Sequence, residues 1–233
     1  MSIIVQKFGG TSVADVARIR EVARHVEKEV KIGNQVVVVV SAMAGTTNQL
    51  VDWGREGNTC HDFEEYDVIL STGEQVTSGL LALSLQNIGI KARSWMSWQI
   101  PLETDSTHGK ARIIDIDTEV IKKSLQSGSV AVIPGFQGIS SKNKITTLGR
   151  GGSDAQKIAN ITYEEMLEMA SQGAKVLQTR SVALAMRYNV SLQVRSSFEN
   201  IPGTMVLNED EILEQETITG IAYSPDEAKI TLR

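Results

Sequence analysis

The stretch that decides the fold is Ile3-Ile4-Val5-Gln6-Lys7-Phe8-Gly9-Gly10, close to the start of the chain. It is a short apolar run that ends at a pair of glycines. After Val13 the apolar residues recur with the spacing of one helix face, at Val16, Ile19, Ala23, Val26 and Val30. We interpret this order as a strand, a glycine loop and a helix, the opening unit of an α/β fold.

The same order returns further along the chain. The unbroken β-branched run at 36–40 is typical of a strand that is buried on both faces of a parallel sheet. Beyond it, the pattern predicts helices at 72–88 and 118–126 and strands at 91–95 and 130–133. Alternating strands and helices, with glycine loops at the strand ends, predict a three-layer α/β/α fold that is doubly wound around a mainly parallel sheet.

The rest of the chain is expected to complete this domain and to begin another. The pattern predicts a hairpin from 136–139 and 144–148 that holds the Gly149 loop over the sheet edge, then helices at 163–171 and 181–188 and a strand at 191–195. From Asn208 the composition becomes acidic. We therefore expect one domain at 1–207 and, at 208–233, a linker with the first strand of a second domain.

Composition and charge exclude several classes of protein. The chain has 233 residues and a formal net charge of −5, with scattered lysine and arginine, so we expect no nucleic-acid partner. No run approaches the roughly 18 apolar residues of a membrane span, and the N-terminus does not resemble a signal peptide. Cys60 is the only cysteine, which excludes an intramolecular disulfide and fits a reducing cytoplasm. Cys60 and His61 alone make a poor metal site, so we expect no metal ligands among the side chains.

The first glycine loop offers contacts for an anion. Gly9 and Gly10 allow backbone N–H groups to approach a phosphate, and a helix that opens near Thr11 and Ser12 would add its positive end and two hydroxyl groups. Lys7 would project toward the same point and could neutralise charge on a transferring phosphoryl group. An ordinary strand-to-helix turn with a surface lysine explains these residues equally well.

Two further segments extend the candidate site. The loop after the run of valines, at 41–48, supplies small side chains and hydroxyl groups, with Ser41 and Thr47 as candidate substrate contacts. Glu74 lies in the first turn of the helix predicted at 72–88. It either caps free N–H groups of that turn or binds a substrate ammonium group.

The sharpest motif is Gly149-Arg150-Gly151-Gly152-Ser153-Asp154. An arginine among glycines has no packing role, and its planar guanidinium group suits bidentate binding of a carboxylate. Ser153 could donate a hydrogen bond to a carboxylate or phosphate, and Asp154 could orient Lys7 by pairing with it. A plain structural turn is the alternative.

Together these motifs resemble those of the aspartate kinases, within the amino-acid kinase superfamily. The matching segments are 7–12, 40–43, 71–75, 135–138, 149–154 and 171–177. The resemblance implies that Lys7 and Asp154 are the phosphoryl-transfer pair, that Glu74 binds the α-amino group of aspartate, and that Arg150 and Ser153 bind its α-carboxylate. It further implies substrate contacts from Ser41 and Thr47, and phosphate or nucleotide contacts from Gly9, Gly10, Thr11, Ser12 and Lys175.

The resemblance also implies an activity and a setting. A member of this family transfers the γ-phosphoryl group of ATP, bound with Mg²⁺, to the side-chain carboxylate of L-aspartate and forms 4-phospho-L-aspartate. This is the first step of lysine, threonine and methionine (diaminopimelate) biosynthesis in the cytoplasm. The tail from Ile218 resembles the first strand of a regulatory ACT domain. That implies feedback inhibition by lysine or threonine and a homo-oligomer or hetero-oligomer that forms through this domain.

The chain departs from the family pattern after Asp154. In the family a helix, a strand and a nucleotide-binding loop follow, whereas here Ala155-Gln156-Lys157 follows, so about one βαβ unit of roughly 30 residues or more is lacking. Loss of a strand from inside the sheet would expose two strand edges. We therefore expect the Cα atoms of Asp154 and Ala155 to lie well beyond the roughly 3.8 Å of a peptide unit, with intervening residues absent from this sequence.

Alternatives to an aspartate kinase stay open at this point. A kinase that acts on glutamate or another small acid would use the same kinds of residue. If the junction after Asp154 is continuous, a catalytically inactive amino-acid-binding or regulatory subunit, which lacks the nucleotide site, becomes the better interpretation.

Overall fold

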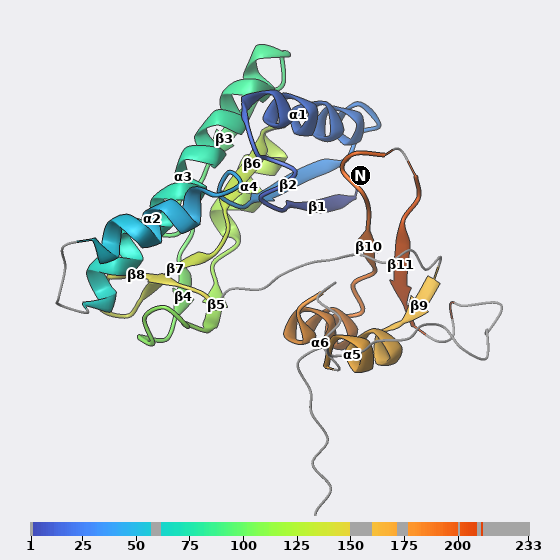
Figure 1. Cartoon of the computed structure of the whole chain (residues 1–233). Coiled ribbons are helices and arrows are strands. Elements are labelled where there is room, and N and C mark those ends of the chain that lie inside the picture. The colour runs from blue at the N-terminus through green and yellow to red at the C-terminus, as the bar shows by residue number, and fades with distance from the viewer. Residues whose placement is uncertain are drawn as a thin grey trace, which may run out of the picture. The chain divides into compact units, whose positions relative to one another are not determined.

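The structure, a computed structural model, describes residues 2–56, 62–149, 160–171, 177–199, 201–208 and 211. The chain forms two compact units, at 1–150 and 151–233, whose helices and strands are labelled in Figure 1. Several sequence predictions lie outside the described residues, among them the break between Asp154 and Ala155, the lack of a metal site at Cys60 and His61, and the ACT strand from Ile218. The proposed domain boundary at 207/208 also stays a prediction.

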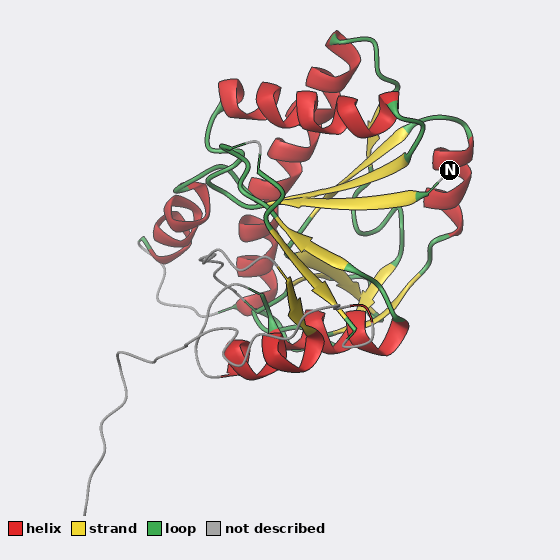
Figure 2. Cartoon of the chain, turned by 90° about the vertical axis from the view of Figure 1, so that its right-hand side faces the viewer, coloured by secondary structure: helices red, strands yellow, loops and turns green. Residues whose placement is uncertain are grey.

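The first unit is built on a four-stranded parallel sheet. Its strands are, in spatial order, β1 (Ile3–Phe8), β2 (Gln35–Val40), β6 (Val130–Pro134) and β3 (Ala92–Ser94). Each was predicted from the sequence, and the parallel sheet is confirmed. Figure 2 shows these strands side by side. Because all neighbouring pairs are parallel, the carboxyl ends of the four strands lie at one edge of the sheet.

Helices cover both faces of this sheet, so the predicted three-layer arrangement is confirmed. On one face lie α1 (Val16–Lys31) and α3 (Phe63–Asn87), and on the other lies α4 (Glu119–Gln126). The valines of β2 alternate between the two layers. Val36, Val38 and Val40 pack in the core with α1 and α3, whereas Val37 packs with α4. This double burial explains why β2 is apolar at every position from 36 to 40.

α3 is the longest helix in the described part of the chain, with 25 residues. By length and composition it is the one helix there that could cross a membrane, because an 18-residue apolar window within it has a mean hydropathy of 1.2. Half of that apolar window is buried inside the protein, and Leu81 and Leu85 are wholly buried in the core with α1. A core helix of this kind passes the same test, so the finding is weak support for a membrane span.

Two helix boundaries differ from the sequence prediction. α3 begins at Phe63 and not at residue 72, because Asp62 caps it by accepting a 2.9 Å hydrogen bond from the N–H of Glu64. The spacing from Asp62 to Glu65 is a capping-box signal that marks this start. α2 (Thr46–Arg55) is a helix where the sequence indicates only a loop, and it starts after Gly45, whose φ is +81°.

The predicted hairpin at 136–148 is confirmed, but it belongs to a separate sheet. β7 (Gln137–Ser140) and β8 (Ile145–Thr147) are antiparallel, and β4 (Leu102–Thr104) and β5 (Ile113–Ile116) extend them in the order β5-β4-β7-β8. The short strands β4 and β5 were not predicted. All four residues of β5 are exposed, so no buried face imposed an alternating pattern on its sequence.

The second unit has its own small core. It contains β9 (Asn160–Thr162), α5 (Tyr163–Ser171), α6 (Thr179–Tyr188), β10 (Leu192–Val194) and β11 (Thr204–Leu207), with the sheet order β10-β11-β9. Both helices and β10 were predicted, whereas β9 and β11 were not. Ile161, Tyr163, Met166, Val182 and Val206 are buried together.

Candidate active site

The candidate residues of the first unit gather at the carboxyl edge of the parallel sheet. β1, β2 and β6 end at Phe8, Val40 and Pro134, and the loops that follow are joined by backbone hydrogen bonds. The N–H of Ser41 donates to the carbonyl of Phe8 at 3.0 Å, and the N–H of Gly135 donates to that of Val40 at 2.9 Å. The loops that follow β1 and β2 are therefore neighbours, at the place where parallel α/β sheets bind their ligands.

The first loop is a tight turn and not the start of a helix. Its N–H at Ser12 donates to the carbonyl of Gly9 at 2.9 Å, and α1 begins only at Val16. Asp15 caps α1 by accepting a 2.8 Å hydrogen bond from the N–H of Arg18. The prediction that the positive end of a helix opens near Thr11 and Ser12 is therefore wrong, because a carboxylate already satisfies that helix end.

The two glycines of this loop have different surroundings. A Cβ atom at Gly10 would lie 3.1 Å from the carbonyl oxygen of Ala42, whereas a Cβ atom at Gly9 would meet nothing within 4 Å. Gly10 thus lets the first loop pack closely on the second, and Gly9 leaves open space. Lys7 is exposed near the end of β1, opposite Val39, and none of the ion pairs found in the described part of the chain includes it.

The second loop leads into α2. Ser41 is half-buried directly after β2, and Thr47 is half-buried in the first turn of α2. The residue before this helix is Gly45, which supplies no side-chain hydrogen bond to the first turn. Five residues separate the end of β2 from the start of α2, whereas seven separate the end of β1 from the start of α1.

Glu74 lies in the fourth turn of α3, well inside the helix, so the capping role is wrong. Its side chain is 3% exposed, and its Oε1 accepts a hydrogen bond from the N–H of Ala42 at 3.1 Å. The preceding Gly73 brings α3 close to the loop, since a Cβ atom there would lie 2.8 Å from the Cβ of Ala42. A nearly buried carboxylate at the end of β2 is a strong acceptor for a charged donor.

A pair of glutamines joins α3 to the hairpin beside this carboxylate, and sequence reasoning did not single it out. Gln137 is 1% exposed and donates from Nε2 to the carbonyl of Ser71 at 3.0 Å. Its Oε1 accepts from Nε2 of Gln75 at 3.2 Å. The residue before it, Phe136, has a φ of +65°, which is uncommon for a side chain of this size. No local sequence signal marks a contact between two residues that are 62 positions apart in the chain.

The remaining predicted site residues are not described by the structure. Arg150, Ser153, Asp154 and Lys175 all lie in the undescribed segments, and only Gly149 of the second motif is described, as an exposed residue. Among the residues that are described, no group of three or more His, Cys, Asp or Glu side chains could hold a metal ion.

Comparison with known proteins gives a consistent set of relatives. The amino acid kinase family model matches residues 2–155. An aspartate kinase of Stutzerimonas stutzeri is 46% identical over the whole chain and 65% of its own length. An aspartokinase of Rickettsia felis is 43% identical over the whole chain and 68% of its own length. The chain spans about 65% of the length of several curated relatives that it matches, aspartate kinases of Stutzerimonas and Pseudomonas species among them.

Solved structures agree with these relatives. Aspartate kinase from Synechocystis is 39% identical with a TM-score of 0.74, over 88% of this chain and 40% of that one. E. coli aspartokinase III in complex with aspartate and ADP has a TM-score of 0.78 at 23% identity, over 88% of this chain and 64% of that one. The second similarity bears on the fold alone.

The alignments with relatives are longer than the chain itself. They extend over 268 and 271 residues for the two proteins above, whereas the chain has 233 residues, so at least 35 and 38 positions of these relatives have no counterpart here. The family model stops at residue 155, one residue after Asp154. A deficit of this size is close to the roughly 30 residues of one βαβ unit.

Proposed function

Because the chain belongs to the amino acid kinase family, among the aspartokinases, we propose that it transfers the γ-phosphoryl group of ATP to the side-chain carboxylate of L-aspartate. The product is 4-phospho-L-aspartate. The observation that carries this proposal is the nearly buried Glu74, which lies against the N–H of Ala42 at the carboxyl edge of the sheet, beside the glycine loop that follows Lys7.

The substrate side of the proposed site uses Glu74 for the α-ammonium group of aspartate. A carboxylate that is 3% exposed interacts with a cation more strongly than a surface carboxylate does. Arg150 and Ser153 are proposed to bind the α-carboxylate, because a guanidinium group matches a carboxylate with two parallel hydrogen bonds. Ser41 and Thr47 are proposed as further substrate contacts.

The phosphoryl-transfer side uses Lys7, with Asp154 proposed to orient it. The nucleophile is a carboxylate that is already ionised at pH 7, so the reaction needs no strong general base. It does need cations, since an anionic nucleophile approaches an anionic phosphoryl group. The exposed ammonium group of Lys7 supplies one positive charge at the end of β1.

The nucleotide is proposed to contact Gly9, Gly10, Thr11, Ser12 and Lys175. The open space at Gly9 fits the close approach of a phosphate. Mg²⁺ is held in many kinases by one or two carboxylates together with the phosphates, so most of its ligands would come with the nucleotide. When bound, it would neutralise charge on the phosphates.

The biological setting follows from the family. We propose a cytoplasmic enzyme at the first step of lysine, threonine and methionine (diaminopimelate) biosynthesis. Residues 208–233 are proposed to open an ACT domain that binds lysine or threonine and joins subunits into a homo-oligomer or hetero-oligomer.

A second candidate function is a catalytically inactive amino-acid-binding or regulatory subunit. The observation that favours it is the deficit of at least 35 aligned positions relative to an aspartate kinase, together with a family match that stops at residue 155. A chain that lacks the nucleotide-binding unit would keep the residues around Glu74 and lose phosphoryl transfer.

One assay separates the two candidates. The purified 233-residue chain is incubated with ATP, Mg²⁺ and L-aspartate, and hydroxylamine traps the acyl phosphate as a hydroxamate. We expect hydroxamate to form with aspartate and not with glutamate. Lys7→Ala is the matched control, and it should lower kcat by a factor of about 10² to 10³, the usual loss for one electrostatic stabiliser. No hydroxamate from a chain that binds aspartate would favour the inactive subunit.

A further inference from the structure

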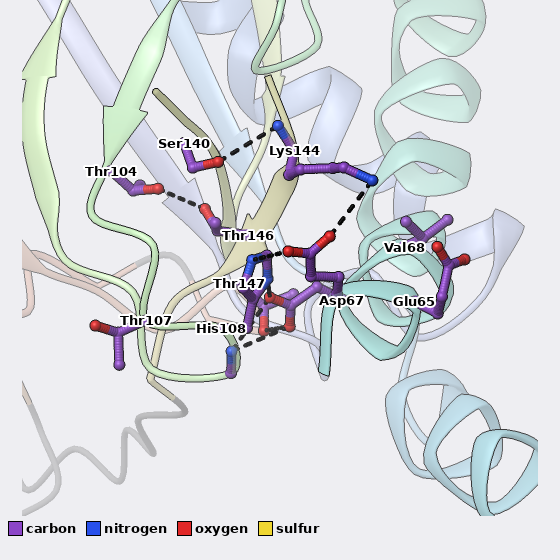
Figure 3. Close-up of polar contacts among 12 residues, drawn as sticks. Glu65, Asp67, Val68, Thr104, Thr107, His108, Ser140, Lys144, Thr146 and Thr147 are labelled. Atoms are coloured by element: carbon purple, nitrogen blue, oxygen red, sulfur yellow. Dashed lines mark hydrogen bonds and ion pairs between the residues drawn. The ribbon is translucent and has the colours of Figure 1, made fainter. Parts of the chain in front are cut away.

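A buried carboxylate outside the proposed site joins three segments of the first unit. Asp67 lies in the second turn of α3, and its side chain is 0% exposed. As Figure 3 shows, Thr147 of β8 and His108 of the β4–β5 loop both point toward it. The hydroxyl of Thr147 lies 2.5 Å from Oδ1, and Nδ1 of His108 lies 2.7 Å from Oδ2. The N–H of Gly109 donates to both oxygens at 3.2 Å.

Glu64 and Lys144 are charged residues beside this cluster in the described part of the chain. Nε2 of His108 lies 3.8 Å from a carboxylate oxygen of Glu64, one turn before Asp67 on α3. The ammonium group of Lys144 lies 3.4 Å from the other oxygen of Glu64. Asp105 closes the β4–β5 loop on itself by accepting the N–H groups of Thr107 and Arg112, at 3.1 and 3.2 Å.

These contacts continue into the candidate site. Directly after Thr147, the N–H of Leu148 donates to the carbonyl of Phe136 at 2.8 Å. Phe136 follows Gly135, whose N–H is bonded to Val40 at the end of β2. The end of β8 is therefore fixed on one side by Asp67 and on the other by the loop that follows β6. Two residues beyond Leu148 the sequence reaches Arg150.

A wholly buried carboxylate costs stability unless all of its oxygens have partners, and here it has three different donors. Asp67 also precedes Glu74 by seven residues, two helical turns, so both side chains lie on one face of α3. A shift of α3 relative to β8 would therefore move Glu74 away from the end of β8, which precedes Arg150 in the sequence.

We propose that Asp67 is a positioning residue for the amino-acid substrate: it fixes α3, which carries Glu74, against the end of β8 through Thr147 and against the β4–β5 loop through His108. The proposal rests on the proposed function. It predicts that loss of this contact weakens aspartate binding even where the loss of folding stability is matched elsewhere.

Thr146 offers a matched control on the same strand. It is 0% exposed like Thr147, and its hydroxyl lies 2.6 Å from that of Thr104, away from Asp67. Thr147→Val and Thr146→Val each remove one buried hydrogen bond and keep the side-chain volume. Thr147→Ser keeps the hydroxyl group and tests for rescue. Asp67→Asn keeps the shape of the side chain and removes its charge.

The experiment measures the Kd for L-aspartate by calorimetry and the Tm of each full-length variant without ligand. We expect Thr147→Val and Asp67→Asn to raise the Kd by about five- to tenfold, the scale of one buried hydrogen bond. Thr146→Val should lower the Tm by a similar amount to Thr147→Val and change the Kd less than about twofold, and Thr147→Ser should bind nearly as the wild type does.

The outcomes distinguish the positioning role from the proposed function. If the wild-type chain does not bind aspartate, both are overturned. If it binds aspartate and Thr147→Val binds equally well, or if Thr146→Val weakens binding as much, only the positioning role is overturned. If Asp67→Asn does not fold, the comparison of Thr147→Val with Thr146→Val still tests the positioning role.

Discussion

At the scale of single residues, tertiary contacts give Glu74 a different role from the one that its local sequence motif suggests. In the sequence it stands beside Gly73 and could cap a helix. In the structure the glycine allows α3 to approach Ala42 closely, and the carboxylate is buried against the N–H of that residue. Gly73, expected in the first turn of a helix, is in fact a close-packing residue in the interior of a long one. Glu74 therefore lies beside the loop that follows β2, which supports the proposal that it binds the α-ammonium group of the substrate.

Glu74→Gln should separate substrate binding from folding. The amide oxygen of glutamine can still accept the N–H of Ala42, but the negative charge for an α-ammonium group is lost. We expect the KM for aspartate to rise by about 10-fold or more, the scale of a charge-assisted hydrogen bond of roughly 1.5 to 3 kcal/mol, and the KM for ATP to change little. Steady-state kinetics with each substrate varied in turn measures this. An equal rise in both KM values would place Glu74 outside the aspartate subsite.

At the scale of elements, the sequence predicts those that are buried on a regular face. β2 and β6 are parallel strands with apolar residues on both faces, and α1 has one apolar stripe toward them. Short or exposed elements leave no such pattern, as the exposed strand β5 shows. The cluster around Asp67 could not be predicted, because its contacts join residues 41 and 80 positions apart. No local periodicity encodes such a pair.

Substitution of two glycines of α3 tests how closely this helix packs on the loop that follows β2. A Cβ at Gly73 would meet the Cβ of Ala42 at 2.8 Å, whereas a Cβ at Gly79 would meet nothing within 4 Å. Gly73→Ala should therefore cost about 1 to 3 kcal/mol of unfolding free energy through overpacking. Gly79→Ala should add about 0.5 to 1 kcal/mol, since alanine favours a helix interior. Urea unfolding of both variants measures the difference. Stabilisation by Gly73→Ala would contradict the close approach of α3 to this loop.

The second unit has a titratable group in its core. Burial raises the pKa of the Tyr163 hydroxyl, and the nearby charge of Glu211 adds to the effect. The hydroxyl donates to the carbonyl of Val190 at 2.7 Å. Because the pKa is raised on folding, the stabilisation is fully present below the unfolded value of about 10 and is lost as the pH rises through the folded value.

Tyr163→Phe is the corresponding test. At pH 7 the variant should lose about 1 kcal/mol of unfolding free energy, the contribution of one hydrogen bond. Above pH 10 the stability of the wild type should fall more steeply with pH than that of the variant, because only the wild type contains this tyrosine. Denaturant unfolding from pH 7 to 11 measures both effects. Parallel pH profiles would show that the Tyr163 hydroxyl does not titrate differently on folding.

At the scale of the whole molecule, the sequence indicates both the family of the chain and the lack of about one βαβ unit. The motifs at 7–12, 71–75 and 135–138 meet around one sheet edge, as the resemblance implies. The residues that would complete the site, from Arg150 to Asp154, lie where the family match ends. A sequence pattern can show that a unit is lacking, but it cannot show whether the remaining chain still binds a nucleotide, because that depends on contacts across the junction.

Ligand-induced stabilisation measures this directly. A ligand that binds only the folded chain raises its stability by about 2.7 kcal/mol at 100 times its Kd, which corresponds to a Tm increase of roughly 5 to 10 °C for a chain of this size. As a kinase, the chain should show such increases with L-aspartate and with a non-hydrolysable ATP analogue and Mg²⁺. Lys7→Ala should keep the aspartate shift. An increase in Tm with aspartate alone would show that the chain binds the amino acid but not the nucleotide. The inactive subunit would then be the better description of this chain.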